Sequence, residues 1–105
     1  MYCSMQPYAQ KLGLDVPLVS YNGALVKGAL SGKVYVNSPL KLQTALDLLQ
    51  YVKENGHYVQ VYMGDKIICK EENEYSRMYA KISGIQAVAI AKKFTALRKL
   101  RTNCF

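Results

Sequence analysis

The chain has 105 residues, half of them hydrophobic and a fifth charged, and its formal net charge is +7. This length suits one small domain with a single modest core, and the composition argues against intrinsic disorder. No apolar run approaches the roughly 18 residues of a membrane span, and the first residues show neither the basic start nor the hydrophobic stretch of a signal peptide.

The first predicted element is a helix that ends at Gly13. Its apolar residues follow the spacing i, i+3, i+4, i+7, which lines one face of a helix: Met5, Tyr8, Ala9 and Leu12. Residues 16–21 then predict a strand. This strand ends at Asn22-Gly23, a dipeptide typical of tight turns because both residues tolerate positive φ.

Two further strands follow, at residues 24–27 and 33–36, with a turn rich in Gly and Ser between them. The second helix repeats the apolar spacing from Leu42 and ends at Gly56. These elements give the first half of the chain one helix, a short run of strands and a second helix.

A second hairpin is predicted from residues 57–63 and 66–69, which flank the turn dipeptide Gly64-Asp65. The third helix shows the same apolar spacing over residues 75–82 and ends at Gly84. The last apolar run, residues 85–91, is compatible with a strand or with the start of a helix. The order of these elements predicts an α/β protein.

The basic residues concentrate at the C-terminal end of the chain. Residues 1–83 contain nine Lys or Arg against seven Asp or Glu, a net of +2, whereas residues 84–105 contain five basic residues and no acid. The tail, residues 91–105, can form a basic amphipathic helix with the residues just before it. Such a helix either docks as an ordinary helix with a solvated face or binds a membrane surface, a partner groove or a polyanion.

Three cysteines, Cys3, Cys69 and Cys104, are an odd number with no close pair. This spacing indicates reduced thiols rather than a disulfide framework or a metal knot, so we expect the protein in the cytoplasm.

Few residues offer chemistry. His57, the single histidine, is either a general base or a polar residue at the join between a helix and a strand, and we favour the second. The acidic cluster Glu71, Glu72 and Glu74 either binds a metal or favours the start of the third helix, and we again favour the second.

The nine tyrosines either form a stacking surface for nucleic acid or belong to the core and its margin, and we favour the core. Neither GxGxxG nor GxxxxGK[ST], the loops that cradle phosphate, is present.

The stretch L-G-L-D-V-P-L-V-S-Y-N-G-A-L-V at residues 12–26 resembles a passage of Cof-type phosphatases in the haloacid dehalogenase superfamily. In that family a helix ends in an L-G-L-like segment and a core strand then ends in N-G-A. The later elements up to about residue 84 follow the family's order, and the N-G-A passage is the most specific part of the match.

The resemblance implies a Rossmann-like parallel core with a large α/β cap of type IIB inserted after the N-G-A strand. Residues 1–27 would then be a remnant of the core, one helix and one strand, and residues 28–90 a partial cap. Residues 91–105 match nothing expected of the family at that point.

The resemblance also implies hydrolysis of phosphate monoesters, often sugar phosphates, with Mg²⁺. The sequence lacks the family's D-x-D-G-T motif, which carries the nucleophile, and its G-D-x-x-N-D motif, which binds the metal. The family's phosphate-holding lysine also has no counterpart here. We therefore predict no catalytic residue and no metal ligand in this chain. Asn22 and Gly23 alone match a functional position of the family, at the border of the active-site entrance. An ordinary turn between two strands explains these two residues equally well.

We accordingly expect a fragment of a Cof-type phosphatase that is inactive alone, from a truncated or frame-shifted reading frame. One alternative is a small basic binding module that uses residues 91–105 on nucleic acid or another polyanion. Another is a stand-alone interaction domain that has kept the cap fold. Unpaired strands in a partial sheet predict self-association, and a phosphorylated small molecule is the expected ligand of an intact parent. We favour neither nucleic acid nor a membrane as a partner.

Overall fold

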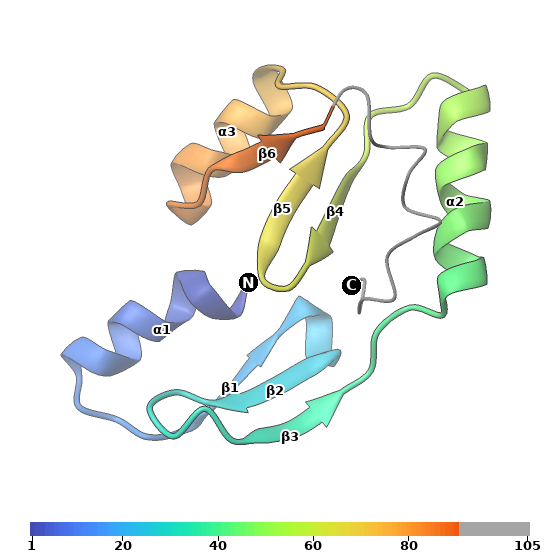
Figure 1. Cartoon of the computed structure of the whole chain (residues 1–105). Coiled ribbons are helices and arrows are strands. Elements are labelled where there is room, and N and C mark those ends of the chain that lie inside the picture. Colours follow the sequence, from blue (N-terminus) through green and yellow to red (C-terminus); the bar gives the residue numbers. More distant parts are fainter. Residues whose placement is uncertain (91–105) are drawn as a thin grey trace. The chain divides into compact units, whose positions relative to one another are not determined.

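The computed structural model describes residues 1–90 (Figure 1), which divide between two compact units: Met1–Pro39 and a second unit that begins at Leu40. The expectation of a single core is wrong, because each unit buries its own side chains. Tyr2, Ala9 and Ala29 are buried in the first unit. Met63, Ile67 and Cys69 are buried in the second.

The first unit contains one helix and one sheet. Its elements are α1 (Tyr2–Lys11), β1 (Pro17–Ser20), the single turn η1 (Tyr21–Gly23), β2 (Leu25–Gly28) and β3 (Val34–Asn37). The strands lie in the order β1-β2-β3, and both pairings are antiparallel. The family resemblance placed the boundary between core and cap at residues 27/28; in the structure β3 still pairs with β2, and the compact units divide at 39/40.

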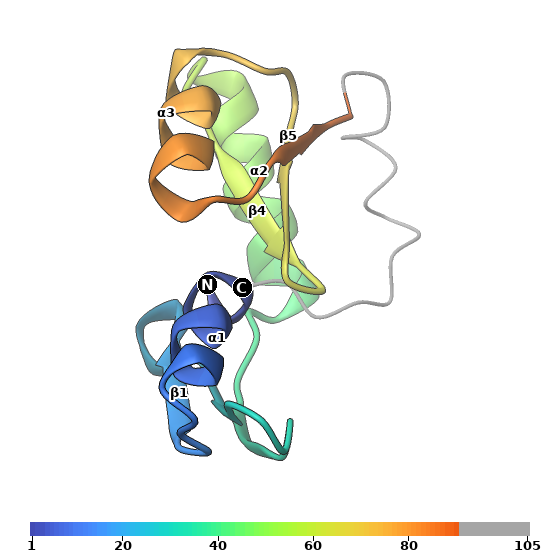
Figure 2. The ribbon, with the colours of Figure 1, turned by 90° about the vertical axis from the view of Figure 1, so that its left-hand side faces the viewer.

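Helix α1 packs beside β1 (Figure 2) and is held to the sheet mainly through Tyr2. The buried Tyr2 hydroxyl donates to the carbonyl oxygens of Gly28 at 2.8 Å and Ala29 at 3.3 Å. The Lys27 ammonium lies 4.6 Å from the centre of the Tyr2 ring. Lys27 therefore marks the sheet face that is turned toward α1.

The apolar stripe of α1 is only partly covered. Ala9 is buried as the spacing predicted, but Tyr8 and Leu12 are 69% and 70% exposed. The sequence correctly predicted the helix, whereas the burial of its whole apolar face is not seen.

The second unit again combines helices with a three-stranded sheet. Its elements are α2 (Leu42–Glu54), β4 (Gln60–Met63), β5 (Lys66–Cys69), α3 (Glu74–Ser83) and β6 (Ala87–Ala89). The strand order is β4-β5-β6. β4 and β5 form the expected antiparallel hairpin, and β6 pairs with β5 in parallel, so the last apolar run is a strand.

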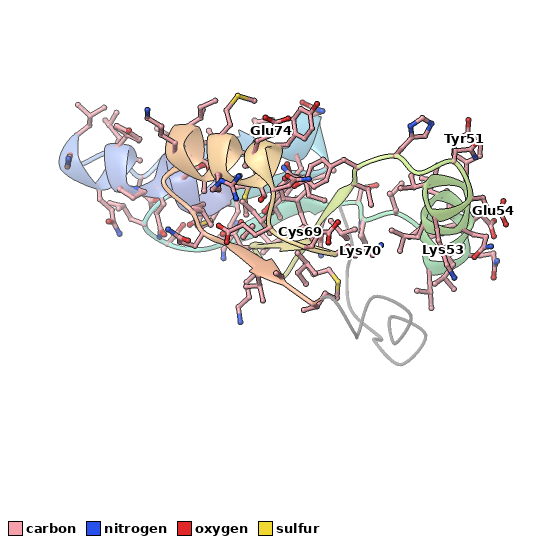
Figure 3. The ribbon with its side chains drawn as sticks, turned by 90° about the horizontal axis from the view of Figure 1, so that it is seen from above. Tyr51, Lys53, Glu54, Cys69, Lys70 and Glu74 are labelled. Atoms are coloured by element: carbon pink, nitrogen blue, oxygen red, sulfur yellow. The ribbon has the colours of Figure 1, made fainter. Side chains whose placement is uncertain are left out.

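The two faces of this sheet carry different side chains. Because Tyr62 pairs with Ile67 and Gln60 pairs with Cys69, these residues share one face. Helix α3 contacts that face, with the Tyr62 and Tyr79 rings 6.1 Å apart. Figure 3 shows Cys69 on its strand and Glu74 in the first turn of α3. On the other face, Met63 packs with Leu49 of α2 and with Val61 and Ile68.

Within residues 1–90, each of the helices α1, α2 and α3 ends where a glycine was expected to stop it. Gly13, Gly56 and Gly84 have φ of 65°, 68° and 72°, the left-handed conformation that glycine adopts without steric cost. The start of α3 is fixed by a capping box, in which Asn73 accepts from the Ser76 N–H at 3.0 Å and the Ser76 hydroxyl accepts from the Asn73 N–H at 2.9 Å.

The tyrosines are less buried than the sequence predicted. Tyr2 is buried and three are half-buried, but Tyr8, Tyr35, Tyr51, Tyr58 and Tyr75 are exposed. The predicted helix of the basic tail lies outside the described residues. Within residues 1–90, no helix is both long enough and apolar enough to cross a membrane.

Candidate functional site

The site predicted from the sequence is the turn at the carboxyl end of β1. Ser20, the last residue of β1, is buried and extended, with φ −134° and ψ 168°. The chain then reverses through η1, closed by a hydrogen bond of 3.1 Å from the Ala24 N–H to the Tyr21 carbonyl. Asn22 is exposed and Gly23 is half-buried at the tip of this turn.

Three consecutive residues of the turn have positive φ. Tyr21 and Asn22 have φ of 52° and 53°, and Gly23 has φ of 95°. Asparagine and glycine tolerate this region, whereas for a large residue such as tyrosine it is uncommon and strained. Strain of this kind gathers at ligand-binding sites and switch regions, so the turn is the strongest candidate site in the described chain.

The chemistry that this turn can offer is recognition rather than bond breaking. The exposed Asn22 carries an amide that can both donate and accept hydrogen bonds. The nearby Ser20 hydroxyl donates to the Leu25 carbonyl at 3.3 Å, so it serves the sheet. The turn can therefore border a ligand, and its chemistry does not include a nucleophile.

Asp15, just before β1, is the single Asp or Glu among residues 1–39. Its Oδ1 accepts from the backbone N–H groups of Leu30 at 3.0 Å and Ser31 at 3.1 Å, and from the Ser31 hydroxyl at 3.3 Å. The two backbone hydrogen bonds, that of Leu30 first, hold the pKa of Asp15 below its usual value. This carboxylate fixes the turn between β2 and β3.

His57 lies at the join between α2 and β4, as expected. Its backbone N–H donates to the Val52 carbonyl at 3.1 Å, and its exposed ring lies 6.2 Å from the ring of Tyr51. These contacts give it the place of a polar residue after a helix. A role as a general base gains no support from them.

The acidic cluster does not act as the helix cap itself. Asn73 is the N-cap of α3, and Glu74 lies in the first turn, where a negative charge is favourable. Glu71 and Glu72 precede the cap and are exposed. In the described part of the chain, no three His, Cys, Asp or Glu side chains gather as metal ligands would.

Sequence reasoning missed two features of the first unit. The left-handed conformation begins at Tyr21, one residue before the Asn-Gly dipeptide that signalled the turn. No local pattern marks a tyrosine for that conformation. The role of Asp15 was also missed, although Asp is a residue type that often binds backbone N–H groups in turns.

Comparison with known proteins now identifies the fold. A family model of haloacid dehalogenase-like hydrolases matches residues 1–102. Among solved structures, a haloacid dehalogenase-like hydrolase from Bacteroides thetaiotaomicron is similar with a TM-score of 0.78 and 17% identity. The protein TM0651 from Thermotoga maritima gives 0.75 and 22%, and a haloacid dehalogenase-like hydrolase from B. subtilis gives 0.72 and 17%.

Each similarity covers 97% of this chain, but only 39%, 38% and 43% of those three chains, in the same order. The chain thus spans about two fifths of the length of the structures that it resembles. No curated protein matches it significantly. The family match over nearly the whole sequence agrees with the α/β fold and with the resemblance seen at residues 12–26, and the chain belongs to the haloacid dehalogenase-like hydrolases.

Proposed function

We propose that this chain is part of a Cof-type phosphatase, with its first unit from the catalytic core and its second from the cap. The observation that supports this proposal most strongly is the family match over residues 1–102. The N-G-A passage supports the finer assignment, since in the structure it closes the end of β1 as the resemblance requires. The proposed reaction of an intact parent is hydrolysis of a phosphate monoester.

By itself, the chain is proposed to be inactive. Phosphoryl transfer requires a positioned nucleophile and positive charge around the phosphate oxygens. The sequence contains no D-x-D-G-T and no G-D-x-x-N-D. Gly64-Asp65 does not replace the second motif, because it forms the hairpin turn between β4 and β5 and Lys66 follows it.

The residues present also do not fit Mg²⁺, the ion implied by the resemblance. Within residues 1–90 no group of three acidic, His or Cys side chains could hold a metal. The carboxylate of Asp15 is engaged by backbone N–H groups. No step of the reaction is therefore assigned to a metal held by the described residues.

An assay of the purified chain with p-nitrophenyl phosphate and Mg²⁺ tests the proposed inactivity. We expect no hydrolysis above the rate without protein. Two results together would overturn the proposed inactivity: hydrolysis that EDTA abolishes, and loss of this hydrolysis in the triple variant D15N/D47N/D65N. The activity would then belong to carboxylates of this chain. Hydrolysis that the triple variant retains does not depend on the aspartates of this chain, and a chain purified by a second, unrelated route that lacks it identifies a contaminating phosphatase.

The family activity is tested on the DNA that flanks the coding segment. We expect upstream sequence that encodes D-x-D-G-T and downstream sequence that encodes G-D-x-x-N-D. The protein encoded by this segment together with both flanks should hydrolyse phosphate monoesters. The same protein with the first Asp of its D-x-D-G-T motif changed to Asn should not. Flanks that encode neither motif would refute the proposed parent.

A further inference from the structure

The sequence contains two Asn-Gly dipeptides, Asn22-Gly23 in η1 and Asn55-Gly56 directly after α2. Asparagine is a thermolabile residue, and it is most reactive before glycine, because glycine has no Cβ to shield its backbone nitrogen. Both asparagines are exposed, and nothing lies within 4 Å of the position that a Cβ would take at either glycine. The two dipeptides are therefore candidates for chemical modification.

The reaction at such a dipeptide is deamidation through a cyclic imide. The backbone nitrogen of Gly23 loses its proton and attacks Cγ of Asn22, which forms an N–Cγ bond. The Cγ–Nδ2 bond breaks, and the leaving nitrogen takes up a proton and departs as ammonia. Water then opens the imide at one of its two carbonyl carbons, which gives aspartate or isoaspartate. The first step requires the Gly23 nitrogen to meet Cγ of Asn22.

The backbone of the folded turn keeps these two atoms apart. Asn22 has φ of 53° and ψ of 34°. Ring closure requires the following nitrogen to lie on the same side of the Cα–C bond as Cβ, whereas in an L residue this ψ turns that nitrogen almost directly away from Cβ. Asn22 must therefore leave the left-handed conformation before it can react.

A hydrogen bond holds the turn in this conformation. The Ala24 N–H donates to the Tyr21 carbonyl at 3.1 Å, and this bond spans both Asn22 and Gly23. The antiparallel pairing of β1 with β2 holds the two ends of the turn. Because rotation about ψ of Asn22 moves Tyr21 and Ala24 relative to each other, the bond between them must break before the imide can close.

We infer that Asn22 is a site of spontaneous deamidation, protected while the turn is closed and reactive when the turn opens. Local opening of an exposed turn costs less free energy than unfolding of the whole unit, so the reaction proceeds through such openings in the folded chain. The constraint lies in the backbone of the turn itself. The inference is therefore independent of the proposed phosphatase parent.

The two products differ in their effect on the turn. Aspartate tolerates positive φ, so it keeps the turn and adds a negative charge at its tip. Isoaspartate carries the main chain through Cβ and lengthens it by one carbon. The bond from Ala24 to Tyr21 then no longer forms in its present geometry, so this product leaves the turn open.

Peptide mapping by mass spectrometry tests the inference on the 105-residue chain and on a synthetic peptide of residues 12–27, both incubated in mildly alkaline buffer. Trypsin cuts after lysine, which places Asn22 in residues 12–27 and Asn55 in residues 54–66. We expect Asn22 to deamidate in the peptide, because an isolated hairpin is at best marginally stable. In the folded chain its rate should be lower by about tenfold or more, a factor that an opening free energy of ~1.4 kcal/mol supplies. A chain that reacts at the rate of the peptide, or a peptide in which Asn22 stays unmodified, overturns the inference.

Ala24→Pro tests whether the turn itself gives the protection. Ala24 has φ of −69°, which proline adopts, and proline lacks the N–H that closes the turn. Deamidation of Asn22 should accelerate toward the rate of the peptide, whereas Ala24→Ser keeps the N–H and should react as the wild type does. Asn55, whose amide donates to the Tyr51 carbonyl at 2.8 Å in the second unit, should be unaffected.

Equal rates at Asn22 in Ala24→Pro and Ala24→Ser would refute protection by the turn. Equal acceleration at Asn55 would also contradict it, because the effect of the substitution would then not be confined to the turn. The comparison of the wild-type chain with the peptide decides the question even where Ala24→Pro does not fold.

Discussion

The carboxylate of Asp15 and residue Ser31 are joined by two hydrogen bonds, from the Ser31 backbone N–H at 3.1 Å and from its hydroxyl at 3.3 Å. Asp15 precedes β1, and Ser31 belongs to the turn between β2 and β3. One side chain thus connects two segments of the first unit that are sixteen residues apart. Because the bonds favour the ionised carboxylate, they also couple this turn to pH.

We predict that Asp15→Asn reduces the acid sensitivity of the first unit. The folded-state pKa of Asp15 is lowered, so its contribution to the free energy of unfolding is complete above the unfolded pKa of about 3.9 and is lost as pH falls through the folded-state pKa. The amide that replaces the carboxylate retains an acceptor oxygen but does not titrate.

Hydrogen exchange at the Leu30 and Ser31 amides measures this effect. Lowering the pH below about 4 should reduce protection, corrected for intrinsic exchange, more in the wild type than in Asp15→Asn. Asp47→Asn is the matched control, because Asp47 accepts from the Gln43 side chain within α2. An Asp15→Asn chain with unchanged acid sensitivity would contradict the prediction.

At the candidate site, we predict that Gly23→Ala lowers the free energy of unfolding by roughly 1–2 kcal/mol. Gly23 has φ of 95°, and a Cβ there is strained even though nothing lies within 4 Å of its position. Asn22→Gly is the control: Asn22 is exposed with φ of 53°, and glycine accepts that conformation. Urea denaturation followed by circular dichroism compares the variants. Equal stability of Gly23→Ala and wild type would count against the turn geometry.

At the start of α3, we predict that Asn73→Ala costs about 1 kcal/mol of stability in the second unit. Ser76→Ala should cost a similar amount, since its buried hydroxyl accepts from the Asn73 N–H and also donates to the Asn73 carbonyl at 2.9 Å. Because both changes break one capping box, the double variant should lose less than the sum of the two. Additive losses in urea denaturation would show that the two side chains act independently.

In the first unit, we predict that Tyr2→Phe costs about 1 kcal/mol, because it removes a buried hydroxyl that donates to Gly28 and Ala29. Tyr8→Phe, on the exposed side of the same helix, should be neutral. Thermal unfolding of the two variants gives the comparison. A Tyr2→Phe chain as stable as Tyr8→Phe would show that the hydroxyl bonds contribute nothing.

The parts of the fold that local patterns determine were predictable. The glycines at 13, 56 and 84 each follow a helix of regular apolar spacing, and each adopts the expected positive φ. The Asn-Gly turn and the hairpin around Gly64 were also found, because turn residues and alternating strands lie close together in the sequence. At the candidate site the turn at Asn22 and Gly23 was predicted, and the place of these residues at an active-site entrance stays a prediction.

Pairings between residues far apart in the sequence could not be predicted from local patterns. The short run Ala87–Ala89 carries no period that separates strand from helix, and its pairing with Ile67–Cys69 is set across the whole of α3. Likewise, the apolar spacing of α1 predicts which side chains share a face, not whether anything covers Tyr8 and Leu12. The positive φ of Tyr21 lies in the turn that joins β1 to its antiparallel partner β2, and no local pattern marks it.

Because Cys69 is buried, the rate at which its thiol reacts with a labelling reagent reports on the opening of the second unit. Its thiol is fully buried on β5 and lies 3.9 Å from the Val88 carbonyl on β6, and burial, aided by the nearby Glu72, raises its pKa. Since the thiolate is the reactive form and the thiol is buried, a labelling reagent can reach Cys69 only after the second unit opens around β5. Cys3 on α1 is only half-buried, so its reaction with the same reagent requires less opening than that of Cys69. In a chain with Cys104 changed to Ser, the amount by which Cys69 reacts more slowly than Cys3 therefore measures how rarely the second unit opens.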